Sequence, residues 1–146
     1  MPVELRNAQR RIRVDVRRVK RVAEKLLEGL RREKMVLSLL LTGDRQMATL
    51  HERWMGDPSP TDVLSFPMKA VRPEPVEGQR PRLLGDIAIS VEMAARRHPR
   101  DPMKEIEKYL IHGILHLVGH DHVRAVDHKK MSAEARRLSR LIAKEH

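Results

Sequence analysis

The chain has 146 residues, the usual size of one domain, and a formal net charge of +10. This charge favours polyanionic partners such as RNA, with a merely well-solvated basic surface as the alternative. The absence of cysteine excludes disulfides and thiolate ligands, so any metal site must use His, Asp or Glu. The longest apolar run, residues 35–41, is too short to cross a membrane, and the N-terminus lacks a secretion signal. We therefore expect one cytoplasmic domain, residues 1–146, without a membrane partner.

A short opening strand at residues 3–5 precedes a strongly patterned helix between Asp15 and Gly29. Asp15 suits the N-cap, and Gly29 lies near the predicted end. The apolar residues recur every three or four positions, as on one face of an amphipathic helix: Val19, Val22, Ala23, Leu26, Leu27 and Leu30. The opposite face is basic, which suits solvent and nucleic-acid phosphates equally: Arg17, Arg18, Lys20, Arg21, Lys25 and Arg32.

Short strands and helices alternate through the rest of the chain. In order, the patterns predict a strand at 36–41, a helix marked by Met47, Leu50 and Trp54, a strand at 63–68, an exposed Pro-rich loop at 69–82, a strand at 87–90 and a helix at 91–97. The segment 105–118 is apolar nearly all round, which is typical of a buried central helix. An amphipathic helix at 125–144 closes the chain. This order predicts an α+β fold with a small mixed sheet of about four strands packed with about five helices.

Three histidines, His112, His116 and His122, have the spacing of a metal site. His112 and His116 lie four residues apart on the predicted central helix, so both imidazoles lie on one face, one turn apart. Gly119 can take the left-handed conformation that ends a helix, after which the chain can bring His122 to the same ion. Three imidazoles leave a fourth position for water, as in catalytic zinc sites. We therefore expect the metal on the central helix and the following turn, zinc first and nickel or another divalent transition ion next.

Alternatives remain open within this stretch. A single buried histidine is usually a hydrogen-bonded core residue, but three unpaired imidazoles would cost on the order of 1–3 kcal/mol each. His120 is the main rival for the third ligand, and Asp121 could either orient an imidazole or cap a turn. The spacing also matches the HExxHxxGxxH pattern of zinc metalloproteases, but Gly113 stands where those enzymes carry their catalytic Glu. That difference disfavours a peptidase.

Three stretches of the sequence resemble the YbeY family of endoribonucleases. Residues 112–122, HGILHLVGHDH, are similar to the family signature HGxLHLxGYDH. Residues 60–67, PTDVLSFP, and residues 84–90, LGDIAIS, match the family segments PTDVLSFP and LGDIxIS in the same order and spacing. The resemblance extends from about residue 36 to the last helix, and the histidine motif is highly specific.

The resemblance implies a metal-dependent endoribonuclease that acts on single-stranded RNA. It also implies a role in ribosomal RNA maturation, especially at the 3′ end of the small-subunit RNA, and in ribosome quality control. The small ribosomal subunit and assembly factors would then be partners. The implied fold is α+β with a mixed sheet, and the implied zinc site lies at one end of a cleft. The family's ligand positions fall on His112, His116 and His122, in agreement with the spacing.

The sequence departs from the family pattern at two places. The signature Tyr is His120 here, which adds an imidazole that could bind the metal or carry a proton. The family often has an Asn four residues before an Arg, and these positions are His51 and Met55 here. The Arg thought to contact an RNA phosphate is therefore missing, and Arg53 is the nearest candidate substitute. Two residues are about 200° of helix rotation, so Arg53 need not face the cleft.

The expected chemistry is metal-assisted cleavage of a phosphodiester. Zinc can lower the pKa of bound water toward about 7 or polarise a phosphoryl oxygen, and an RNA 2′-hydroxyl could instead be the nucleophile. Asp62 and Asp86, each near the start of a motif strand, are candidate general bases, with a strand-end hydrogen bond or cap as the alternative role. Trp54 is expected to pack beneath the site. A zinc-stabilised ribosome-assembly factor without catalysis is the remaining alternative.

Overall fold

The computed structural model describes residues 3–67, 83–119 and 125–143 of the chain. In order, these residues form β1 (Val3–Asn7), α1 (Val16–Gly29), β2 (Val36–Thr42), α2 (Asp44–Met55), β3 (Val63–Pro67), β4 (Leu83–Ser90), α3 (Val91–Arg97), α4 (Pro102–Leu117) and α5 (Ala125–Ala143). The predicted α+β fold is confirmed. The loop predicted at 69–82 lies outside the described residues.

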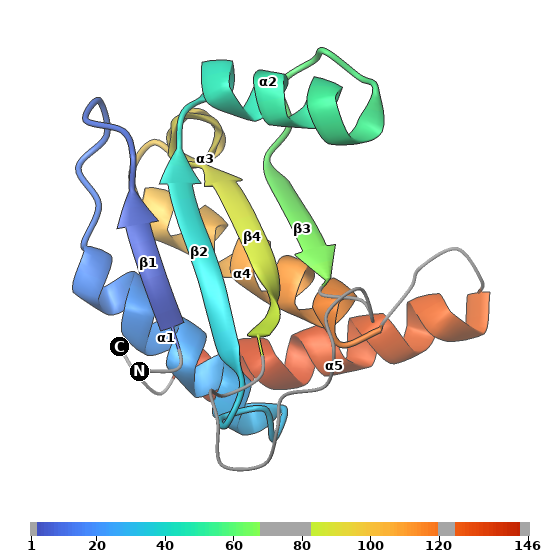
Figure 1. The fold of residues 1–146 in the computed structure, drawn as a ribbon. Helices are drawn as coiled ribbons and strands as arrows, with labels where there is room; N and C mark the ends of the chain where they lie inside the picture. Colours follow the sequence, from blue (N-terminus) through green and yellow to red (C-terminus); the bar gives the residue numbers. More distant parts are fainter. Residues whose placement is uncertain (1–2, 68–82, 120–124, 144–146) are drawn as a thin grey trace.

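The strands form one mixed sheet in the order β1-β2-β4-β3 (Figure 1). β1, β2 and β4 are parallel, and β3 runs antiparallel along β4. Parallel neighbours need a long crossover, and α1 supplies the one from β1 to β2. Helices α1, α4 and α5 cover one face of the sheet, and α2 packs on the other face near the carboxyl ends of the parallel strands. The two faces are therefore covered to different extents.

Two hydrophobic clusters hold the helices on the sheet. The larger cluster joins the sheet to α1, α4 and α5, and its fully buried side chains include Ile87 and Ile89 of β4 and Leu110 and Ile114 of α4. The smaller cluster lies beneath α2, where Met47 is fully buried. Helix α4 is thus the buried central helix that its apolar sequence predicts, and burying such aliphatic side chains contributes about 1.5–3 kcal/mol each.

Helix α1 begins where the sequence predicts. The side chain of Asp15 accepts a hydrogen bond at 3.1 Å from the backbone N–H of Arg18, which satisfies a donor that the helix itself leaves unpaired. The apolar positions of α1 are fully buried against the larger cluster: Val19, Val22, Ala23, Leu26 and Leu27. The cap and the apolar face together confirm the amphipathic helix.

Strand β4 begins four residues earlier than the sequence predicts, at Leu83 instead of residue 87. The additional residues include Gly85, which pairs with β2 on one side and β3 on the other. Both partners are distant in the sequence, and such pairing leaves no periodic signal within β4 itself. The local sequence pattern therefore underestimates the length of β4.

Two glycines allow α4 to lie close against β4. A Cβ atom at Gly113 would lie 3.0 Å from Cδ1 of Ile87. A Cβ atom at Gly85 would lie 2.6 Å from the carbonyl oxygen of Phe66 and 2.7 Å from Cδ2 of Leu117. Ordinary van der Waals contacts of a Cβ are 3.4–4 Å. These two positions thus set how closely the C-terminal half of α4, which carries the histidines, approaches the sheet.

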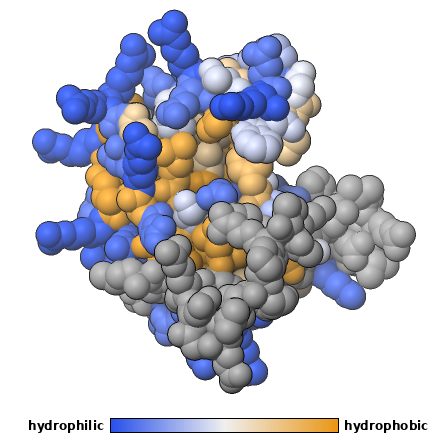
Figure 2. All heavy atoms as spheres, viewed as in Figure 1, coloured by the Kyte–Doolittle hydropathy of each residue, from blue (hydrophilic) through white to orange (hydrophobic). Residues whose placement is uncertain are grey.

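The sheet face that carries α2 is only partly covered. Figure 2 shows apolar atoms over the middle of this face and hydrophilic side chains around them. A groove of about 880 Å³ lies here, lined in part by Trp54, Phe66 and Asp86. Trp54 is 62% exposed, with its ring centroid 5.5 Å from that of Phe66. The expectation that Trp54 packs beneath the histidines is therefore wrong.

None of the described helices is both long and apolar enough to cross a membrane.

Candidate metal centre

Helix α4 places two imidazoles side by side at its C-terminal end. The Nε2 atoms of His112 and His116 lie 3.1 Å apart, with ring centroids at 4.6 Å and the ring planes at 67°. His112 is exposed and His116 is half-buried. The four-residue spacing on one helix face produces this approach, as the sequence predicts. Gly113, about 100° round the helix from His112, packs on Ile87 of β4.

This pair fits the donor set of a transition-metal ion. Two nitrogens bound to one tetrahedral ion at 2.0–2.1 Å lie about 3.3–3.4 Å apart, close to the 3.1 Å between the two Nε2 atoms. Gly119 has a φ of 99°, the left-handed conformation expected after α4. His122 lies outside the described residues, as do His120 and Asp121. Among the residues that the structure describes, no group of three His, Asp or Glu side chains could hold a metal, so the third ligand stays a prediction.

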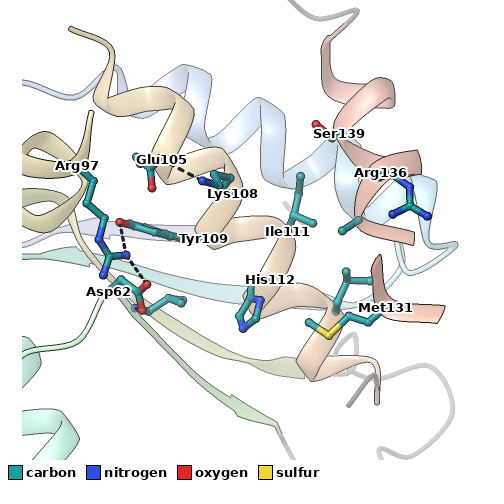
Figure 3. Close-up of a pocket in the computed structure, with 13 residues that line it drawn as sticks. Asp62, Arg97, Glu105, Lys108, Tyr109, Ile111, His112, Met131, Arg136 and Ser139 are labelled. Carbon is teal, nitrogen blue, oxygen red and sulfur yellow. Dashed lines mark hydrogen bonds and ion pairs between the residues drawn. The ribbon is translucent and has the colours of Figure 1, made fainter. Parts of the chain in front are cut away.

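A pocket of about 510 Å³, here called the histidine pocket, opens beside His112. Asp62 and Arg97 line one side of it, and Met131 and Arg136 of α5 line the other (Figure 3). The residues come from β3, α3, α4 and α5 or from the loops beside them, so the pocket exists only in the folded chain. It joins charged groups to an exposed imidazole, which is the composition expected of a binding site for a polar ligand.

Asp62, Arg97 and Tyr109 form a connected polar group in this pocket. Nη1 of Arg97 donates hydrogen bonds to Oδ2 of Asp62 at 2.7 Å and to the Tyr109 hydroxyl at 3.2 Å. Oδ1 of Asp62 accepts a hydrogen bond from the Val63 backbone N–H at 2.8 Å. The guanidinium of Arg97 also lies 5.9 Å from the centre of the Tyr109 ring. Asp62 thus makes both the strand-end hydrogen bond and a contact that extends into the pocket.

The environment fixes the charges of this group. Partial burial raises the pKa of Asp62, but the hydrogen bonds from Arg97 and from the Val63 backbone N–H, together with the charge of Arg97, hold the pKa of Asp62 below its usual value. The hydrogen bonds to Asp62 and Tyr109 raise the pKa of Arg97. Burial raises the pKa of Tyr109, against the opposing effect of Arg97. At neutral pH the pocket therefore holds a carboxylate, a guanidinium cation and a neutral phenol.

The structure separates the other two candidate site residues from the histidines. Asp86 lies on the opposite face of β4 from Ile87 and lines the groove shared with Trp54. Arg53 is exposed on α2 and does not line the histidine pocket. Of the candidate residues outside the histidine motif, only Asp62 thus shares a pocket with His112. The roles proposed from the sequence for Arg53 and Asp86 stay predictions.

Sequence reasoning missed Arg97 and Tyr109. Arg97 ends the short helix α3, and Tyr109 lies in the middle of the apolar helix α4. One signal in the sequence is a tyrosine within a helix that is predicted to be buried. A buried Tyr hydroxyl usually has a hydrogen-bond partner, so Tyr109 indicates a polar neighbour. The identity of that partner depends on how α3 packs against α4, which no local pattern reports.

The fold and the site define an α+β protein that carries a helical histidine pair of metal-binding geometry beside a charged pocket. The sequence matches the family described as Endoribonuclease YbeY over residues 4–142. The chain belongs to this family.

Individual relatives agree with this assignment. The chain is 43% identical to the endoribonuclease YbeY of Thermobifida fusca, over 80% of this chain and 79% of the relative. It is 40% identical to the endoribonuclease YbeY of an Anaeromyxobacter species, over 96% of this chain and 71% of the relative. The solution structure of TM1509 from Thermotoga maritima is similar, with a TM-score of 0.61 at 24% identity, covering 98% of this chain and 90% of that one. This last similarity supports the fold alone.

Proposed function

We propose that this chain is a zinc-dependent endoribonuclease that cleaves single-stranded RNA. Its proposed role is ribosomal RNA maturation at the 3′ end of the small-subunit RNA, together with ribosome quality control. The proposal is carried by the approach of two imidazole nitrogens to 3.1 Å beside a charged pocket. The name endoribonuclease carried by its relatives supports it. The small ribosomal subunit and its assembly factors are the proposed partners, and the net charge of +10 suits an RNA-rich partner.

His112, His116 and His122 would hold the ion in this proposal. When bound, zinc supplies a Lewis acid that can polarise a phosphoryl oxygen and lower the pKa of a water molecule. Neutral imidazoles are ligands that zinc, nickel and related ions share, so the donor set favours zinc without requiring it. Because these ligands carry no charge, the full positive charge of the ion would remain to attract a phosphate.

Arg97 is the residue best placed to bind a phosphate in the histidine pocket. Its side chain is 50% exposed, and both hydrogen bonds that it forms with described residues are donated by Nη1. Nη2 and Nε therefore stay available to a phosphate, which arginine binds through two donors at once. Asp62 acts here as a positioning residue, because its carboxylate holds the guanidinium at the pocket.

Asp62 is also the better placed of the two candidate general bases. It lines the same pocket as His112, whereas Asp86 lies across the sheet. The lowered pKa keeps Asp62 anionic at neutral pH, but it also makes the carboxylate a weak proton acceptor while Arg97 is bound to it. We therefore infer that the positioning of Arg97 is its main contribution.

The packing of α4 gives the peptidase alternative no support. The zinc peptidases need a Glu directly after the first histidine, and at that position, Gly113, a Cβ would lie 3.0 Å from Cδ1 of Ile87, closer than an ordinary van der Waals contact. Whether the chain is instead a non-catalytic assembly factor is decided by measuring RNA cleavage.

Metal removal tests the proposed function. In single-turnover reactions with a small-subunit RNA precursor, we expect chelator-stripped protein to lose cleavage and zinc-reloaded protein to regain it, because the ion supplies the electrophile. RNA binding by the stripped protein, measured in parallel, shows that it is still folded. A duplex of the same sequence is the matched control and should resist cleavage. Absence of cleavage in both states would leave the assembly-factor alternative, and equal cleavage in both would contradict metal dependence.

A further inference from the structure

A second pocket, of about 800 Å³, opens at the carboxyl ends of β1 and β2. We call it the arginine pocket, because Arg10, Arg11, Arg45 and Arg96 line it. Arg10 and Arg11 follow β1, Arg45 lies in the first turn of α2, and Arg96 lies near the end of α3. Crevices outside the carboxyl ends of parallel strands are common ligand sites in open sheets. Two carboxylates, Asp44 and Glu92, line it as well, so the four arginines leave the pocket with a net positive charge.

Two of the four arginines are neutralised within the pocket. Arg11 forms an ion pair with Glu92 at 3.3 Å, and Arg96 forms one with Asp44. The carboxylate of Glu92 also accepts the backbone N–H of Asp44 at 2.8 Å, at the start of α2. These contacts form part of the wall of the pocket. Because they pair two arginines with two carboxylates, the net positive charge of the pocket comes from the other two arginines.

Arg10 and Arg45 leave the pocket positive. Both side chains are exposed, and neither forms an ion pair with any residue that the structure describes. Arg10 also belongs to the most basic part of the chain. Residues 6–21 contain eight Lys or Arg and one acidic residue, a net +7 of the total +10. A surface of this kind attracts the phosphates of a nucleic acid strongly.

The arginine pocket and the histidine pocket are both lined by residues of the last turn of α3. Arg96 lines the first pocket, and the next residue, Arg97, lines the second together with His112. The backbone N–H of Ser90, the N-cap of α3, donates to the carbonyl oxygen of Asp62 at 2.9 Å, which connects the start of α3 to a residue of the histidine pocket. Consecutive residues of α3 therefore contribute one guanidinium to each pocket, as a single polyanionic chain that occupies both would require.

We propose that the arginine pocket binds backbone phosphates of the same single-stranded RNA that occupies the histidine pocket. The identity of the ligand as RNA rests on the proposed function. The residues that line the arginine pocket include no aromatic side chain, so it offers charge without a stacking platform. It would therefore hold the backbone and set the register of the strand without reading bases.

The double variant Arg10→Ala/Arg45→Ala tests this inference against a matched control, Lys34→Ala/Arg140→Ala. Both variants remove two exposed positive charges, and the control residues lie before β2 and on α5, outside both pockets. Affinity for a labelled single-stranded RNA of about 16 nucleotides is measured by fluorescence anisotropy at several salt concentrations. Thermal unfolding of each variant verifies the fold.

We expect the arginine variant to lower the slope of log affinity against log salt by about 1.4, since each lost phosphate contact removes about 0.7. At about 0.1 M salt its affinity should fall on the order of 10-fold or more, while the control variant stays at the wild-type value. An oligonucleotide of about four nucleotides, too short to fill both pockets, should bind all three proteins alike. Equal losses in both variants, or no loss in either, would overturn the inference.

Cleavage separates this inference from the proposed function. In the arginine variant, KM for the long RNA should rise while kcat stays unchanged, because the lost contacts are remote from the scissile bond. If none of the proteins cleaves RNA, the proposed function fails, but the difference in binding between the two variants still decides whether the arginine pocket holds RNA.

Discussion

Replacing His116 by alanine is expected to reduce cleavage of single-stranded RNA at least about 100-fold, because loss of a metal ligand should exceed the 10–100-fold cost of losing an outer contact. The variant removes the nitrogen that lies 3.1 Å from Nε2 of His112, so the ion loses one of its expected ligands. RNA binding should persist, since the arginines that attract the backbone are untouched. Single-turnover rates and equilibrium binding, measured on the same preparations, separate the two effects.

His98→Ala is the matched control for this experiment. His98 lies between α3 and α4, where its Nδ1 accepts a hydrogen bond from the backbone N–H of Asp101 at 3.2 Å, and it does not line the histidine pocket. Its replacement should leave the cleavage rate per folded molecule unchanged. Wild-type cleavage by the His116 variant would contradict the assignment of His116, and an equal loss in both variants would point to a general loss of folding.

Replacing Gly85 by alanine is expected to destabilise the fold by about 1–3 kcal/mol, the usual cost of overpacking. The added methyl carbon would lie 2.6 Å from the carbonyl oxygen of Phe66, a backbone atom that cannot rotate away, and 2.7 Å from Cδ2 of Leu117. Relief of the clash requires β3 or the end of α4 to move. Urea unfolding would measure the loss, and weaker zinc binding should accompany it because His116 precedes Leu117.

Gly56→Asn is the control, because a Cβ at this glycine position would meet no neighbouring atom. Gly56 has a φ of 74° at the end of α2, and a Cβ there would meet nothing within 4 Å. Asparagine tolerates the left-handed conformation better than other side chains, so a small change in unfolding free energy is expected. If Gly85→Ala were as mild as Gly56→Asn, the close approach of β4 to β3 and α4 would not be important for stability.

Much of the fold could be predicted because its signals are local. The capping side chain of Asp15, the apolar face of α1 and the apolar run of β2 each act within a few residues, and the structure confirms all three predictions. The placement of His112 and His116 on one helix face also follows from a local signal. Four-residue spacing on a helix forces two side chains onto one face whatever the rest of the chain does.

The features that sequence reasoning missed depend on contacts between distant segments. The start of β4 is set by pairing with β2 and β3, and the polar group in the histidine pocket joins Asp62, Arg97 and Tyr109 from three elements. Trp54 was misplaced for a related reason. Its position on one face of α2 was clear, but the face of the sheet that α2 covers is a property of the topology.

The two candidate aspartates have similar sequence contexts but different positions in the fold. Asp62 and Asp86 both lie in motif segments, and no feature of the sequence distinguishes their roles. In the sheet, alternation of side chains turns Asp86 away from α4, whereas Asp62, ahead of β3, is held at the histidine pocket by Arg97.

X-ray absorption spectroscopy on zinc-loaded protein tests the proposed centre most directly. We predict one zinc per chain with three imidazole nitrogens at about 2.0–2.1 Å and one further light ligand. A first shell made of oxygens alone, or the lack of stoichiometric zinc after loading, would contradict the convergence of His112, His116 and His122 on a single ion.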